Sequence, residues 1–103
     1  MPFDGNNRTM SPLTHLLADA RQQLDQGWCQ HRTRQRGSAC MIGSLTISDY
    51  QDFLAAERLL LEGIVALGHS ELSIAQFNDA PGRTKQQVLQ VYDHAIEQSL
   101  IVA

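Results

Sequence analysis

The stretch that decides the fold is SDYQDFLAAERLLLEGIVALG, residues 48–68. It opens with Ser48 and, three residues later, Gln51, a pattern typical of a capping box, in which two side chains satisfy backbone N–H groups at a helix start. Its second half is apolar almost all round, which indicates an enclosed position. We therefore predict a helix over residues 49–67 as the central element of an all-α fold. Gly63 inside it favours a close helix crossing, because glycine otherwise costs a helix about 1 kcal/mol.

The segment before this helix predicts a first helix and a polar loop. Ser11-Pro12 is a typical helix start, because serine accepts a hydrogen bond from the first turn and proline has no N–H to leave unpaired there. Gly27 is expected to end this helix in the left-handed conformation. A basic loop follows at residues 28–37, and then a short apolar segment at 39–45. We favour a short helix for that segment, with a short buried strand as the alternative, because the two have the same pattern at this length.

The segment after residue 68 predicts a short helix and a corner. Ser70 is expected to cap this helix, which runs to Phe77. Asn78 is expected to close it in the left-handed region, which asparagine tolerates. Pro81-Gly82 then makes the turn toward the last helix.

A second capping box, formed by Thr84 and Gln87, predicts a last helix that runs to about Ser99. The chain is thus expected to be all-α, a compact single-domain bundle of four to five helices. We expect a flexible N-terminal tail at residues 1–10 and a single helical domain at 11–103.

Composition narrows the functional classes. A chain of 103 residues with 43% hydrophobic and 18% charged residues predicts one globular domain. Eight cationic and eleven anionic side chains give a net charge of −3, which disfavours nucleic acid as a partner without excluding a local basic patch. The chain opens on no leader pattern, and no apolar run approaches the roughly 20 residues of a membrane span. These features predict a cytoplasmic protein with no membrane partner and reduced thiols.

The two cysteines raise two chemical alternatives. Cys29, His31 and Cys40 are soft or borderline metal ligands, but structural zinc requires four ligands and no paired C-x-x-C motif is present. We therefore predict no metal and no cofactor, with these three residues as the alternative metal site. A small cysteine-dependent enzyme is a second alternative, although a nucleophilic thiol needs a base and a group that orients it, and nothing marks the third member.

Two polar segments are candidates for binding. Arg32, Arg34 and Arg36 alternate with polar residues in the basic loop, where a phosphate or an acidic partner could dock. Residues 71–90 resemble a helix-turn-helix in part, and this motif would make the chain a DNA-binding regulator. Asn78 stands where such a motif requires an apolar residue, which counts against it.

The corner between the last two helices supplies the other binding candidates. Asn78, Asp79 and Arg83 are expected to shape it, with Asp79 paired to Arg83. They would form a site only if they converge with Trp28 and the Cys40 segment on one cleft. An architectural role explains the same residues without a site.

The chain resembles a family of small helical domains of unknown function from actinobacteria and their phages. The resemblance covers about residues 11–99 and rests on short motifs, in which Ser44 and Phe77 replace alanine and tryptophan: Gly27-Trp28, Gly37, Cys40, Gly43-Ser44-Leu45, Phe77-Asn78-Asp79, Arg83-Thr84 and Val88. It implies a helical domain and no established activity. We therefore predict a bacterial, non-enzymatic module that binds another protein or has a regulatory role.

Overall fold

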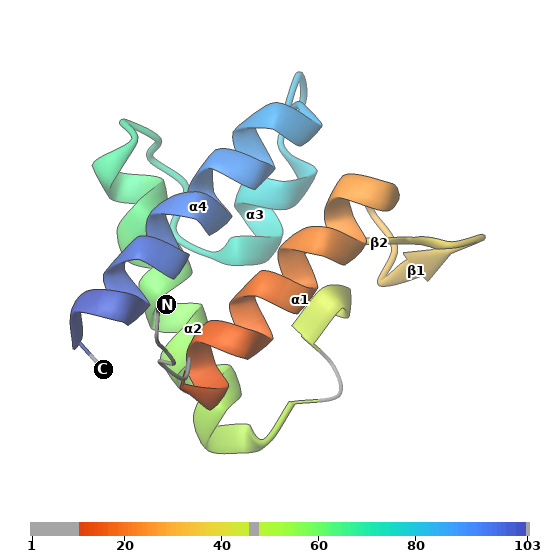
Figure 1. Ribbon diagram of the computed structural model, residues 1–103. Coiled ribbons are helices and arrows are strands. Elements are labelled where there is room, and N and C mark those ends of the chain that lie inside the picture. The colour runs from red at the N-terminus through yellow and green to blue at the C-terminus, as the bar shows by residue number, and fades with distance from the viewer. Residues whose placement is uncertain (1–10, 46–47, 103) are drawn as a thin grey trace.

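The computed structural model describes residues 11–45 and 48–102, and the predicted tail at 1–10 lies outside this part (Figure 1). Helices dominate the described residues, which confirms the all-α fold class and a compact single domain. The elements in chain order are α1 (Pro12–Gln26), β1 (Arg34–Gln35), β2 (Ser38–Ala39), the 3₁₀ helix η1 (Gly43–Leu45), α2 (Tyr50–Ala66), α3 (Ile74–Asp79) and α4 (Lys85–Val102). None of the described helices combines the length and apolar character needed to cross a membrane.

The core lies where α1, α2 and α4 meet, and α3 covers one end of α2 (Figure 1). The prediction that residues 49–67 form the most enclosed helix is wrong. One face of α2 is buried, but Val65 is 69% exposed and Leu67 is 42% exposed. Helix α4 takes the central position instead, because α1 and α2 each pack more extensively against α4 than against each other. The predicted close crossing is confirmed: a Cβ atom added to Gly63 would lie 3.2 Å from the carbonyl oxygen of Val91 on α4.

Two helix starts have the predicted local chemistry. Ser11 caps α1 by accepting a hydrogen bond from the Thr14 N–H at 3.1 Å. The Thr84 hydroxyl accepts from the Gln87 N–H at 3.2 Å, and the Gln87 amide oxygen accepts from the Thr84 N–H at 3.1 Å, which confirms the capping box. Gly68 closes α2 with a φ of 89°.

Two predicted helix starts are wrong by a few residues. Asp49, not Ser48, caps α2, and the Ser48 hydroxyl instead donates to the Leu45 carbonyl oxygen at 2.6 Å. Ser73, not Ser70, caps α3. In both places two good capping residues stand close together in the sequence.

The loop after α1 also differs from the prediction. Gly27 is extended, with a φ of −170°, and does not take the left-handed conformation. Its lack of a side chain matters for another reason: a Cβ atom there would lie 2.7 Å from the carbonyl oxygen of Gly37. The apolar segment 39–45 contains the end of strand β2 and then the η1 turn, so the helix and strand alternatives each hold for part of it.

Tyr92 joins α4 to the segment that precedes η1. Its ring is fully buried, and its hydroxyl donates to the Met41 carbonyl oxygen at 3.1 Å and lies 3.2 Å from the Ser44 hydroxyl. Burial raises the pKa of Tyr92 well above its ordinary value, although the Ser44 hydrogen bond partly opposes this.

This burial predicts a loss of stability in alkali. Above about pH 10 the phenol ionises in the unfolded chain while it stays neutral in the folded one, so the free energy of unfolding should fall by about 1.4 kcal/mol per pH unit. Denaturant unfolding between pH 8 and 11 measures this slope. Tyr92→Phe should remove it, whereas Tyr50→Phe, at a side chain that is 70% exposed, should retain it. Equal slopes in the two variants would contradict the assignment.

Candidate binding site

Asn78 on α3 is the centre of a hydrogen-bonded cluster that ties the loop after α1 to α3. Its side-chain oxygen accepts from the Trp28 indole N–H at 2.8 Å and from the Met41 backbone N–H at 3.1 Å. Its amide nitrogen donates to the Cys29 carbonyl oxygen at 3.1 Å and to the Asp79 carboxylate at 2.9 Å. All four hydrogen-bonding positions of the amide are therefore used, and the residue is only 2% exposed. Asn78 does not close the helix in the left-handed region, as the sequence had suggested; it lies inside α3.

Asp79 and Gln30 extend this cluster to the surface. The Asp79 carboxylate accepts from the His31 backbone N–H at 2.8 Å, and the Gln30 amide donates to the carbonyl oxygens of Asn78 and Ala80, both at 3.0 Å. Burial alone would raise the pKa of Asp79, but the hydrogen bonds from His31 and Asn78 outweigh it and lower that pKa. Asp79 is therefore ionised at neutral pH. The sequence did not predict that Gln30 and His31 bind the loop to α3. No local pattern marks a residue whose hydrogen-bond partners lie far along the chain.

A pocket of about 240 Å³ opens beside this cluster. The residues that line it come from the loop after α1, from the segment before η1 and from α3: His31, Arg32, Thr33, Cys40, Ile42, Ala75, Asn78 and Asp79. The loop, the Cys40 segment and the corner thus meet in one place. Trp28 contacts the cluster from the core side and is half-buried.

Arg83 lies apart from this pocket. Its guanidinium stacks 3.7 Å from the centre of the Phe77 ring, donates to the Phe77 carbonyl oxygen at 2.7 Å and pairs with Glu71 at 3.0 Å. The side chain is only 7% exposed. The predicted pairing of Asp79 with Arg83 is wrong, since the two residues have different partners.

The arginine hairpin, residues 31–39, is the other candidate surface. Arg34 pairs with Ala39 and Gln35 with Ser38, so Arg36 and Gly37 form the two-residue turn. Both turn residues have positive φ, 48° and 85°, as a type I′ turn requires. A left-handed arginine is uncommon, since Asn-Gly is the favoured pair for this turn.

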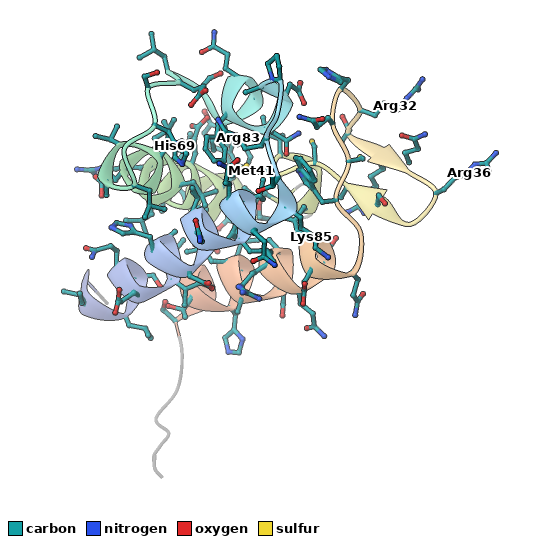
Figure 2. The ribbon with its side chains drawn as sticks, turned by 90° about the horizontal axis from the view of Figure 1, so that it is seen from above. Arg32, Arg36, Met41, His69, Arg83 and Lys85 are labelled. Atoms are coloured by element: carbon teal, nitrogen blue, oxygen red, sulfur yellow. The ribbon has the colours of Figure 1, made fainter. Side chains whose placement is uncertain are left out.

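The three arginines of the hairpin have different environments. The Arg34 guanidinium is tied down, since it donates to the Gln23 side chain at 3.2 Å and to the Gly43 carbonyl oxygen at 3.0 Å. Arg32 and Arg36 are exposed, and their side chains extend away from the helices (Figure 2). Within residues 11–45 and 48–102, neither side chain has a hydrogen-bond or ion-pair partner.

The alternative chemistries find little support in the geometry. No group of three His, Cys, Asp or Glu side chains in the described part of the chain is placed to hold a metal ion, which includes Cys29, His31 and Cys40. Burial, followed by the proximity of Cys40 and Asp79, raises the pKa of Cys29, so this thiol is protonated at neutral pH and is a poor nucleophile.

Three of the residues that a helix-turn-helix would offer to DNA have partners within the domain. Arg83 is buried against Phe77, the Gln87 side chain bonds Arg83 and Thr84, and the Lys85 ammonium donates to the Asp25 carbonyl oxygen at 2.8 Å. Lys85 accordingly lies between α4 and α1 (Figure 2).

These features define a small helical domain with a protruding basic hairpin and a small pocket at its base. The chain belongs to the family of unknown function DUF6197, whose model matches residues 8–98. No curated protein and no solved structure matches the sequence.

Proposed function

We propose that this domain is a non-enzymatic binding module that docks an acidic surface of another protein through the arginine hairpin. The observation that carries the proposal is the state of Arg32 and Arg36, two exposed guanidiniums without partners in the described chain, on a hairpin that projects from a protein of net charge −3. Guanidinium groups bind carboxylates with paired, charge-assisted hydrogen bonds. We place the module in the bacterial cytoplasm.

The turn at the hairpin tip supports this proposal independently. Arg36 occupies a left-handed position that asparagine or glycine would adopt at lower cost. Backbone strain of this kind is typical of positions retained for contact with a ligand or partner. Arg34, bound to the Gly43 carbonyl oxygen, holds the base of the hairpin against η1, so the two free arginines are presented from a fixed support.

The test uses a substitution that the turn favours. Arg36→Asn creates the preferred Asn-Gly turn and deletes one charge, so the variant should fold at least as well as the parent. In a crosslinking pull-down from the native host, its recovery of partner should fall about tenfold or more, because one charge-assisted hydrogen bond is worth about 1.5–3 kcal/mol. Arg58→Gln is the matched control. It removes one charge from the exposed face of α2 and should leave recovery unchanged.

Two results would count against the proposal. One is failure to recover a specific protein under crosslinking. The other is an equal loss with Arg36→Asn and Arg58→Gln, which would mean that net charge alone matters. A gel shift with duplex DNA at low salt provides the third arm, since phosphate contacts are strongest there; DNA binding that Arg36→Asn leaves intact would favour the regulator alternative.

A further inference from the structure

The two cysteines lie next to each other at the base of the arginine hairpin. Trp28 and Ala39 form a parallel bridge, in which the Ala39 N–H donates to the Gly27 carbonyl oxygen at 2.9 Å and the Cys29 N–H donates to the Ala39 carbonyl oxygen at 3.1 Å. One residue further along each segment, Cys29 and Cys40 are therefore neighbours in the same register.

This register suits a covalent link between the thiols. Paired positions on adjacent extended segments lie about 4.8 Å apart and project from the same side, and disulfides join residues whose Cα atoms are about 4.4–6.8 Å apart. The influence of Cys40 on the pKa of Cys29 is further evidence that the two thiols are close.

The present partners of both sulfur atoms are weak and replaceable. The Cys29 thiol donates to the Arg32 carbonyl oxygen at 3.5 Å, and the Cys40 sulfur accepts from the Gly43 N–H at 3.2 Å. Both cysteines are half-buried, and Cys40 lines the pocket, so a small reagent can reach this pair from solvent.

We propose that Cys29 and Cys40 are a redox-active dithiol that closes reversibly to an intramolecular disulfide by exchange with a small-molecule disulfide. The thiolate of Cys40, the cysteine that lines the pocket, attacks a sulfur of the small disulfide, forms a mixed disulfide and releases one small thiolate. The second protein thiolate then attacks the protein sulfur of that mixed disulfide and releases the other. The protein loses two protons and two electrons, and the small disulfide gains them as two thiols.

The product would close the loop 29–40, which contains all three hairpin arginines. The disulfide would join Cys29, at the start of this loop, to Cys40, which follows β2. It would therefore hold the two ends of the hairpin together. This inference does not depend on the proposed function, because it concerns the chemistry of the two thiols alone.

The experiment equilibrates the full chain with mixtures of reduced and oxidised glutathione, alkylates the remaining thiols and measures intact and peptide masses. We expect both thiols to disappear together, the chain to lose the mass of two hydrogen atoms, and one peptide to contain Cys29 linked to Cys40. Dithiothreitol should reverse all three changes. The oxidised protein should melt at least about 5 °C higher, because the link restricts the unfolded chain.

Cys29→Ser and Cys40→Ser are the matched controls. Each retains one thiol, so each should form only a mixed disulfide with glutathione and should show no gain in melting temperature. The proposal is overturned if both thiols of the parent chain remain free in the most oxidising mixture. It is equally overturned if the cysteines take up glutathione independently, or if the crosslinks join two chains.

Discussion

Replacing Asn78 by leucine is expected to lower the free energy of unfolding by about 3–5 kcal/mol, which is near the upper end for a single substitution. Leucine has a similar size but neither accepts nor donates, so the Trp28 indole N–H, the Met41 backbone N–H and the Cys29 carbonyl lose their partner. Each buried group left unsatisfied costs about 1–3 kcal/mol. Met41 is fully buried, so water cannot replace the amide at its N–H without opening the cluster.

Denaturant unfolding measures this loss, and fluorescence reports the same contact, because Trp28 is the only tryptophan of the chain. Gln76→Leu is the control on the same short helix. Its side chain is exposed and accepts one hydrogen bond from the Leu72 N–H, so its loss should stay below about 1 kcal/mol. A similarly small loss at Asn78, with unchanged tryptophan emission, would show that the cluster does not hold the loop.

Asn78→Asp tests the side-chain oxygen and the side-chain nitrogen of Asn78 separately. It keeps the oxygen that accepts from Trp28 and Met41 but replaces the donor with a second negative charge beside the Asp79 carboxylate. Its instability should therefore be greatest at neutral pH. It should shrink as the pH falls toward about 4, because burial beside Asp79 raises the pKa of the introduced carboxyl group, which then takes up a proton and can donate again.

The sequence predicted those features that depend on local chemistry. The caps at Ser11 and Thr84, and the helices that these residues begin, follow from side chains within four residues of each other. Where two capping residues compete, as at Ser48 and Asp49, local chemistry has no basis for a choice. The enclosure of α2 was overestimated for a similar reason, because an apolar surface does not reveal whether another helix covers it.

The sequence predicted several residues of the candidate site, but not how these residues contact one another. The sequence placed Trp28, Asn78 and Asp79 in one group, and the structure brings these three together. It also placed Arg83 in that group, but Arg83 contacts Phe77 and Glu71 instead. Trp28 is separated from Asn78 by two helices along the chain, and such a pairing depends on the whole fold and leaves no local pattern.

A methyl group at Gly43 is expected to be the second large perturbation, with a loss of roughly 2–4 kcal/mol for Gly43→Ala. The added Cβ atom would lie 2.1 Å from the Thr33 carbonyl oxygen and 3.0 Å from its carbonyl carbon. That oxygen accepts from the Cys40 N–H at 3.1 Å and so cannot move alone. Since the φ of Gly43 is not positive, alanine suits its backbone conformation, and the effect isolates the contact between η1 and the hairpin.

Gly63→Ala provides the comparison, because its Cβ atom would lie 3.2 Å from the Val91 carbonyl oxygen and the exchange of glycine for alanine favours a helix by about 1 kcal/mol. Its net change in the free energy of unfolding should therefore stay within about 1 kcal/mol of zero, and parallel denaturant titrations of both variants test this difference. If Gly43→Ala costs no more than Gly63→Ala, the hairpin separates freely from η1. The helical core would then not hold Arg32 and Arg36 in a fixed position, and the hairpin would have to be ordered by its partner instead.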